Sequence, residues 1–234
     1  MPGKPRLKKQ FKASGAVRDI VIGMSDGLTV PFALAAGLTG AVAASHIIIT
    51  AGLAEVAAGS IAMGLGGFLA ARGEEEHYVN EREREHYELK VTPEVEAAEV
   101  AAIFQTYGLE QSEIDPIIAA LTRSHEKYVD FMMRFELGML KPEPGRALTS
   151  ALTIAGSYIT GGIVALSPYF ILNHVHTALI WSVVVTLVAL ALFGYFKAKA
   201  TGAPAVEGAL HTVLVGGVAA AAAFLIARAV SGSA

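Results

Sequence analysis

Residues 147–196 contain no Asp, Glu, Lys or Arg, and this run of 50 uncharged residues limits most strongly how the chain can fold. A soluble domain carries about 25% charged residues, whereas this chain is 17% charged and 53% hydrophobic. Such a run suits a lipid bilayer. The composition excludes a soluble enzyme and a disordered chain. The absence of cysteine excludes a disulfide scaffold, thiolate metal sites and cysteine nucleophiles.

Five apolar segments are long enough to cross a bilayer, which takes about 20 helical residues. They lie at residues 20–44, 47–71, 147–167, 174–196 and 207–227, and the uncharged run is expected to break at Ser167-Pro168 and Asn173-His174. We therefore predict an all-α, polytopic membrane protein with five transmembrane helices. A three-helix cytoplasmic metal-binding domain is expected between the second and third spans.

Charge divides the chain into parts of opposite sign. Residues 72–146 hold 17 acids and 9 bases, whereas the remainder holds 4 acids and 9 bases. Lys and Arg gather in the N-terminal arm and at 197–199, and they are absent from the connections near 45 and at 168–173. Since cytoplasmic loops are rich in Lys and Arg, we expect the N-terminus and the acidic domain in the cytosol and the C-terminus on the lumenal side.

Four parts follow from these boundaries. They are a cytoplasmic basic arm at 1–18, two spans within 19–71, the acidic helical domain at 72–146, and three spans within 147–230. In the acidic domain the second span is expected to continue to about Lys90. A second helix starts at Thr92-Pro93 and ends near Gly108, because Thr caps helices and Pro suits the first helical position. A third runs from Ser112 to about Leu137, with Ser112 and Asp115 resembling a capping box.

Two acids lie within the apolar spans, where each costs from about 2.5 kcal/mol upward. Asp26 is followed by Gly27 and Pro31, which can loosen the helix and free backbone carbonyls. Glu55 shares a helical face with Gly59 and Met63 at i, i+4 and i+8. A carboxylate with a thioether suits a borderline transition metal better than Ca²⁺ or Mg²⁺. In the alternative reading, Glu55 is protonated and bonds a neighbouring helix.

The acidic domain holds a second group of candidate ligands. Like charges at helical spacing repel, and a bound cation would remove that repulsion, whereas Arg82 and Arg84 are expected to point to other faces. The candidate metal ligands are Glu85, Glu88, Glu96, Glu99, Met132, Met133 and Glu136. The alternative is a solvated acidic surface with Met132 and Met133 in a small core. In the third span, Gly161-Gly162 suggests tight helix packing, and Tyr158 faces either the pore or a helix.

A Glu-x-x-His pattern ending at His77 and another ending at His86 offer a rival reading, because carboxylate-bridged di-iron bundles use this spacing. The protein would then be a membrane-anchored ferroxidase. Such bundles use four helices, however, and both copies lie on one predicted helix, so we take no histidine, His125 included, as a primary ligand. An uncoupled channel or metal sensor is the third reading. No Gly-x-x-x-x-Gly-Lys motif is present, which excludes a pump driven directly by ATP.

With these residues in view, the chain resembles the vacuolar iron transporters of plants and yeast over about residues 15–230. The resemblance is most specific in the segment Asp19-Ile20-Val21-Ile22-Gly23-Met24-Ser25-Asp26-Gly27-Leu28-Thr29-Val30-Pro31 with the Phe32–Leu38 stretch after it, around Glu55, Ser60 and Met63, and in the acidic insertion. It is close enough to suggest a plant member. Because shorter relatives lack the insertion, transport and the acidic domain are separable in principle.

The resemblance implies a homodimer in the vacuolar membrane that moves Fe²⁺ from cytosol to vacuole in exchange for protons. It implies an ion path at the dimer interface lined by spans one and two, with Asp26, Glu55 and Met63 as pathway residues. It also implies that the seven acidic-domain ligands named above bind metal. The ion is substrate rather than cofactor. Zn²⁺, Co²⁺, Ni²⁺ and Mn²⁺ are compatible by softness. Membrane lipid is a further expected partner, and nucleic acid is not.

Overall fold

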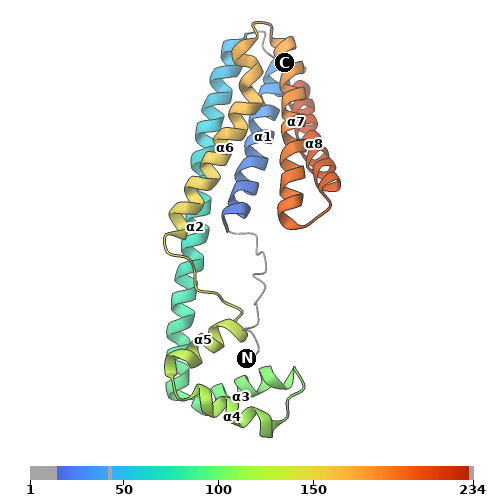
Figure 1. Ribbon diagram of the computed structural model, residues 1–234. Coiled ribbons are helices and arrows are strands. Elements are labelled where there is room, and N and C mark those ends of the chain that lie inside the picture. Colours follow the sequence, from blue (N-terminus) through green and yellow to red (C-terminus); the bar gives the residue numbers. More distant parts are fainter. Residues whose placement is uncertain (1–14, 42–43, 232–234) are drawn as a thin grey trace, which may run out of the picture. The chain divides into compact units, whose positions relative to one another are not determined.

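The computed structural model describes residues 15–41 and 44–231, which form eight helices and, within those ranges, no strand (Figure 1). The helices are α1 (Gly15–Ala41), α2 (Ser45–Val91), α3 (Pro93–Gln105), α4 (Gln111–Leu121), α5 (His125–Phe135), α6 (Arg146–Ile171), α7 (Val175–Thr201) and α8 (Ala205–Ser231). The predicted all-α class is confirmed. Most of the predicted basic arm lies outside the described residues, and residues 15–18 begin α1.

Five helices, α1, α2, α6, α7 and α8, are long and apolar enough to cross a membrane, which agrees with the five predicted spans. The predicted break at Ser167-Pro168 is wrong, because α6 continues to Ile171. Pro168 lacks the N–H that would bond the Val164 carbonyl, and the Ser167 hydroxyl donates to that carbonyl at 2.8 Å instead. The second predicted break is right, since His174 is the N-cap of α7.

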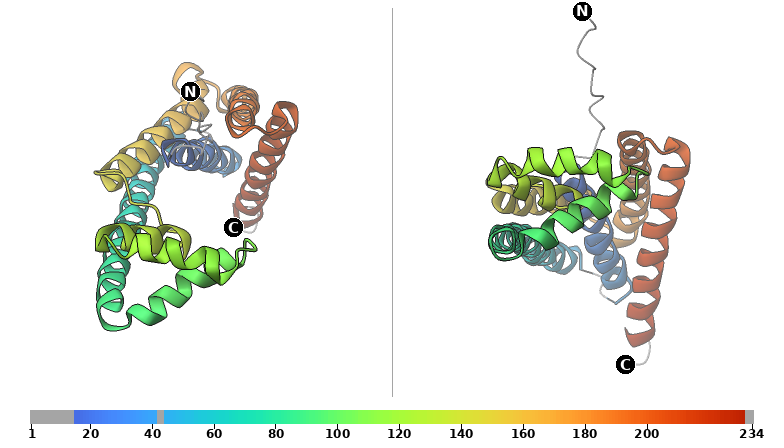
Figure 2. Two further views of the ribbon diagram at one scale, coloured as in Figure 1. Left: turned by 60° about the horizontal axis from the view of Figure 1, so that its bottom comes forward. Right: turned by 90° about the horizontal axis from the view of Figure 1, so that it is seen from below.

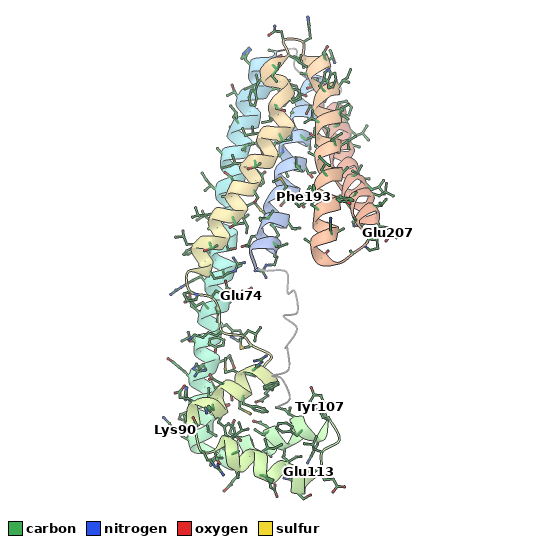
Figure 3. All side chains as sticks on the ribbon, viewed as in Figure 1. Glu74, Lys90, Tyr107, Glu113, Phe193 and Glu207 are labelled. Carbon is green, nitrogen blue, oxygen red and sulfur yellow. The ribbon has the colours of Figure 1, made fainter. Side chains whose placement is uncertain are left out.

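The chain divides into two compact units. The first contains residues 1–68 and 147–234, and the second contains residues 69–146, with the boundary inside α2. The first unit therefore comprises α1, the N-terminal part of α2, and α6, α7 and α8. Glu207, an acid of this unit, lies in the first turn of α8, next to the link from α7 (Figure 3).

Glycines bring α6 into close contact with α1 and α2. A Cβ atom on Gly27 would collide with the backbone of Tyr158, and one on Gly59 would collide with the Tyr158 ring. From the α6 side, a Cβ on Gly161 would lie 2.7 Å from the backbone nitrogen of Leu28. Side-chain-free positions let helix backbones approach closely. The tight packing predicted for Gly161 is confirmed.

The same contact changes the interpretation of Gly27 and Pro31. The sequence suggested that they loosen the first span, but α1 is a continuous helix with Pro31 inside it. Gly27 leaves room for Tyr158 rather than breaking the helix. Pro31 lacks the N–H that would bond the Gly27 carbonyl, so one carbonyl loses its intrahelical donor without interrupting the helix.

Apolar side chains fill the rest of the first unit. One buried cluster joins the four helices α1, α2, α6 and α7 through Ala35, Ile48, Val56, Leu166, Tyr169, Val175 and Ala178. Several polar groups within this packing are paired. The hydroxyls of Thr39 and Tyr169 lie 2.9 Å apart, and Ser182 donates to the Ala165 carbonyl at 2.7 Å. Such pairing is needed where neither water nor lipid can satisfy a polar group.

The second unit contains the C-terminal part of α2 with α3, α4 and α5, and α3 and α4 pack side by side (Figure 2). Two small cores hold it together. Tyr78, Val129 and Met133 form one, and Val100, Tyr128 and Met132 form the other. Both cores take residues from α5, which therefore links α2 with α3.

The predicted third helix of this unit, from Ser112 to Leu137, is instead two helices, α4 and α5. The break follows Leu121, where hydroxyl side chains compete with the helical hydrogen bonds. Thr122 Oγ1 donates to the Ala119 carbonyl at 3.1 Å, and Ser124 takes an extended backbone as N-cap of α5. The helical periodicity of the sequence continues through this break, so the pattern predicted one helix.

Helix ends in this unit follow local chemistry. Thr92 is the N-cap of α3 and Pro93 is in its first turn, as predicted. The start of α4 differs from the predicted Ser112 capping box, because Glu110 is the N-cap and its backbone N–H donates to the Glu113 carboxylate at 3.0 Å. The predicted glycine stops are confirmed. Gly108 follows α3 and Gly138 follows α5, with φ of 83° and 65°, a backbone conformation that disfavours residues with a side chain.

The glycine contact gives a stability prediction. Gly27→Ala should lower the unfolding temperature in detergent, because the new methyl meets the Tyr158 backbone and overpacking costs about 1–3 kcal/mol. Gly156→Ala is the matched control, since nothing lies within 4 Å of its Cβ position on α6. The control should be neutral or slightly stabilising, because Ala favours helix over Gly by about 1 kcal/mol. Equal effects of the two changes would contradict the close contact.

Candidate functional site

Three glutamates of the second unit converge at the junction of α2 and α3. Glu85 and Glu88 are one turn apart on α2, and Glu96 lies in the first turn of α3. One carboxylate oxygen from each lies within 4.8 Å of the other two. The turn at Thr92 makes this possible, because its N–H and hydroxyl both donate to the Glu88 carbonyl, at 2.8 and 3.1 Å. The chain then reverses and returns Glu96 to α2.

Burial makes this cluster unusual among surface acids. Glu85 and Glu96 are each only 2% exposed, and one oxygen of each, Oε2, is buried without a hydrogen-bond partner among the described residues. Buried carboxylates are normally paired or bound to metal. One oxygen from each of three carboxylates, at this spacing, can hold a divalent cation.

The electrostatics of the cluster reflect the same crowding. Burial, followed by the charges of Glu85 and Glu99, raises the pKa of Glu96 to about 7. Burial and Glu88 likewise raise the pKa of Glu85. Partial burial, then Glu99 and Glu85, raise the pKa of Glu136 to about 7, although Glu136 is more exposed than Glu96. Near neutral pH the site is therefore partly protonated, and a metal ion must displace protons to bind.

Glu99 and Glu136 lie within electrostatic range of the three converging carboxylates but outside the 4.8 Å group. Met132 and Met133 are each 1% exposed and belong to two different apolar cores. The structure thus brings the five predicted carboxylates into one region. It places the two methionines as core residues next to that region on α5, as the alternative reading expected.

Arg84 departs from its sequence interpretation. We expected it to point to another face, but its guanidinium lies 2.9 Å from Glu81, 3.6 Å from Glu85 and 3.6 Å from Glu88. An arginine side chain is long enough to reach both adjacent helical turns. Arg82 does point elsewhere, and it pairs with Glu126 at 2.6 Å and Asp130 at 2.5 Å on α5. Arg84 partly neutralises the cluster.

The histidines lie outside this cluster. His77 and His86 are both on α2, and no histidine joins the three-carboxylate group in the part of the chain that the structure describes. His86 instead stacks on His125 at 4.9 Å between ring centroids. The unit has four helical segments rather than the predicted three, but both Glu-x-x-His copies lie on α2, whereas a di-iron bundle takes its two copies from two different helices.

In the first unit, Glu55 and Tyr158 form a hydrogen-bonded pair in which Tyr158 is buried and Glu55 is partly buried. Tyr158 is 2% exposed and donates its hydroxyl to Glu55 Oε1 at 2.5 Å, while Glu55 Oε2 is buried without a partner among the described residues. Tyr158 therefore contacts a neighbouring helix, which was one of its two predicted positions, and it also contacts an acid. Asp26 on α1 is close enough for its charge to act on the same hydroxyl. Asp26, Tyr158 and Glu55 therefore come from three adjoining helices.

Met63 and Gly59 follow Glu55 on the same face of α2, and both are partly buried. Gly59 packs against the Tyr158 ring, so this face of α2 is turned at least partly toward α6. The structure thus groups Asp26 and Glu55 around Tyr158 and leaves Met63 two turns further along α2.

Sequence analysis gave no role to Asp19, which is 1% exposed on α1 and lies 3.9 Å from Arg18. A signal was available, because Asp19 and Asp26 are seven residues apart and thus share a helical face. Gly23 lies between them, and a Cβ on it would collide with the Ile154 carbonyl of α6. Asp19 therefore belongs to the same α1 face that packs on α6.

Comparison with known proteins decides the family. The model of the VIT family matches residues 17–228, which covers both units. The chain belongs to the VIT family.

This chain is similar to several members of the family over nearly its own whole length. Vacuolar iron transporter 1 of Arabidopsis thaliana is 54% identical over 223 residues, covering 95% of this chain and 89% of the relative. Vacuolar iron transporter 1 of Tulipa gesneriana is 53% identical, covering 95% and 90%. Protein CCC1 of Saccharomyces cerevisiae is 40% identical, covering 91% and 68%. The resemblance stated from the sequence, with its plant character, is confirmed.

The raised pKa values predict how this VIT-family chain responds to pH. Because the folded pKa of Glu96, about 7, exceeds its ordinary 4.5, the fold binds this proton more tightly than the unfolded chain does. That stabilisation is complete below the unfolded pKa and is lost as pH rises through the folded pKa. The metal-free, full-length protein should therefore unfold at a lower temperature at about pH 7.5 than at about pH 5.5.

Glu96→Gln tests this directly. The variant should lose most of the pH dependence, and its divalent-metal affinity at neutral pH should fall roughly tenfold or more, as ligand-group changes do. Glu83→Gln is the matched control, because Glu83 is an exposed acid of α2. Thermal melting in detergent with and without Zn²⁺ measures both effects. A wild-type melting temperature that does not change with pH or Zn²⁺ would favour the alternative, a solvated acidic surface.

Proposed function

We propose that this protein carries Fe²⁺ and related divalent transition metals from the cytosol into the vacuole in exchange for protons. Relatives named vacuolar iron transporters, at 54% and 53% identity, support the substrate and the compartment. Five helices able to cross a membrane support a transporter. The basic arm and the acidic unit would face the cytosol, and the C-terminus would face the lumen.

The observation that carries the proposal is the Glu55–Tyr158 pair. A carboxylate in an apolar helix is costly and usually functional. Here one oxygen accepts from Tyr158 at 2.5 Å, and the other is buried without a partner in the described part of the chain. A carboxylate needed only for helix packing would be expected to use both oxygens. The unpaired oxygen is available to a proton or to a metal ion.

Asp26, Glu55 and Met63 are the proposed path. Tyr158 connects the first two, since it bonds Glu55 and lies within range of the Asp26 charge. Carboxylates bind a divalent metal only when deprotonated. A proton arriving from an acidic lumen would therefore displace the metal from the same groups. This competition supports exchange of metal for protons without any nucleotide.

The acidic unit would gather the metal. Its net charge raises the local cation concentration, as acidic clefts do, and the cluster of Glu85, Glu88 and Glu96 offers converging oxygens. Glu99 and Glu136 would extend the cluster. Met132 and Met133 would join as soft ligands only after a change of side-chain packing, because both lie in apolar cores.

A homodimer is part of the proposal. The α2 surface that the described helices of the first unit leave uncovered is rich in small residues, namely Ala54, Ala57, Ala58, Ala62 and Gly66. Small residues on a membrane helix favour close approach of a second helix. A partner chain seated there would put the two copies of α2 together, with Glu55 and Met63 near the interface.

Removal of the Asp26 carboxylate should stop transport. Asp26→Ala in proteoliposomes should show no Fe²⁺ uptake above protein-free vesicles when a pH gradient is imposed, because the proposed path then lacks one of its two acids. Glu207→Ala is the control, since Glu207 is exposed in the first turn of α8. Normal uptake by Asp26→Ala would remove it from the path. Wild-type uptake that ignores the pH gradient would indicate a channel, and oxygen consumption on adding Fe²⁺ would indicate a ferroxidase.

Loss of the Tyr158 hydroxyl should impair the path without abolishing it. Tyr158→Phe keeps the ring that packs on Gly59 but removes the hydroxyl that donates to Glu55 Oε1. The rate of Fe²⁺ uptake should fall about tenfold, as expected for loss of a hydrogen bond to a charged group. Tyr195→Phe on α7, where Tyr195 is 39% exposed, is the control. An unchanged uptake rate would argue against a role for Tyr158 through Glu55.

A further inference from the structure

Tyr128 of α5 has a buried hydroxyl that the described part of the chain does not satisfy. The residue is 1% exposed, and its Oη atom is inaccessible to solvent with no hydrogen-bond partner there. Buried hydroxyl groups are nearly always paired. Neither the sequence patterns nor the resemblance assigns any role to this residue, so its polar atom calls for an explanation.

Tyr128 has apolar residues around its ring and acidic residues near its hydroxyl. Its ring packs with Val100 and Met132 in one of the small cores of the second unit. Its hydroxyl lies within electrostatic range of Glu96, Glu99 and Glu136, with Glu96 the strongest influence. Burial, and then these charges, raise the pKa of Tyr128 to about 12. The group is therefore a neutral phenol at physiological pH and can act as a hydrogen-bond donor.

The acceptor that matches this donor is also unsatisfied. Glu96 Oε2 is buried and has no hydrogen-bond partner among the described residues. Glu96 also contributes an oxygen to the cluster with Glu85 and Glu88. A carboxylate that binds a metal through one oxygen has a second oxygen to be held, and groups that hold it fix the orientation of the ligand.

We propose that Tyr128 is a positioning residue for the acidic metal cluster. It donates its hydroxyl hydrogen to Glu96 when the other oxygen of Glu96 holds a divalent cation. One hydrogen bond then satisfies two buried groups that otherwise lack partners. The inference rests on the proposed metal binding by the acidic unit, and it adds a residue that acts through Glu96 rather than on the metal.

The test uses the full-length protein in detergent and Co²⁺ as the probe, with binding followed by calorimetry at neutral pH. Tyr128→Phe should weaken Co²⁺ binding about 10- to 100-fold, the usual effect of removing a group that orients a ligand. Tyr78→Phe is the matched control, because Tyr78 lies in the other small core of the unit. The control should bind as wild type does. Equal metal-free melting temperatures for the two variants would exclude a general loss of folding.

A double-mutant cycle separates positioning from packing. If Tyr128 acts through Glu96, Tyr128→Phe should have little further effect in a Glu96→Gln background, because coupled groups are non-additive. The same fold-loss in both backgrounds would overturn the inference. So would a visible phenolate charge-transfer band on adding Fe³⁺ that Tyr128→Phe abolishes, since Tyr128 would then bind the metal directly.

Failure of the inference and failure of the proposed metal binding give different results. If wild type binds Co²⁺ and Glu96→Gln weakens it, while Tyr128→Phe binds as wild type does, only the role of Tyr128 is overturned. If wild type does not bind Co²⁺, or if Glu96→Gln binds equally well, the metal-gathering role of the acidic unit fails, and the role of Tyr128 fails with it.

Discussion

The close approach of α6 to α1 and α2 is the contact on which the first unit depends. Gly27 and Gly59 lack the side chains that would hold the helices apart. Tyr158 occupies the space and satisfies one oxygen of Glu55. A carboxylate in apolar surroundings is tolerated because this donor is fixed beside it. The roles of the two glycines, Tyr158 and Glu55 therefore depend on one another.

In the second unit the carboxylates repel one another, whereas in the first unit a single carboxylate is isolated in apolar surroundings. Glu85, Glu88 and Glu96 are held together although their charges oppose the arrangement. The favourable energy comes from two small apolar cores that include α5, and from the Arg82 pairs with Glu126 and Asp130. The apolar packing and these ion pairs hold the carboxylates close to one another, and burial together with the neighbouring acids raises the pKa of Glu96 to about 7.

The sequence was sufficient for features that depend on composition or helical spacing. Uncharged length predicted the five spans, and Thr92-Pro93 predicted the start of α3. It was not sufficient where two segments meet. The partner of Glu55 is 103 residues away in the chain. The unpaired hydroxyl of Tyr128 is visible only once α5 is packed. The periodicity of residues along one helix carries no information about which side chains of other helices they contact.

Arg84 has a consequence for which ions the acidic cluster can accept. Its guanidinium lies within 2.9–3.6 Å of Glu81, Glu85 and Glu88 and is attached to the same helix. A tethered single positive charge is thus always present at high local concentration. Potassium or sodium ions bring no more charge than this resident group already supplies, so they gain little by replacing it. If the cluster takes up cations as proposed, an ion of charge two would be attracted about twice as strongly as the guanidinium at equal distance, and the arginine would disfavour abundant monovalent cations.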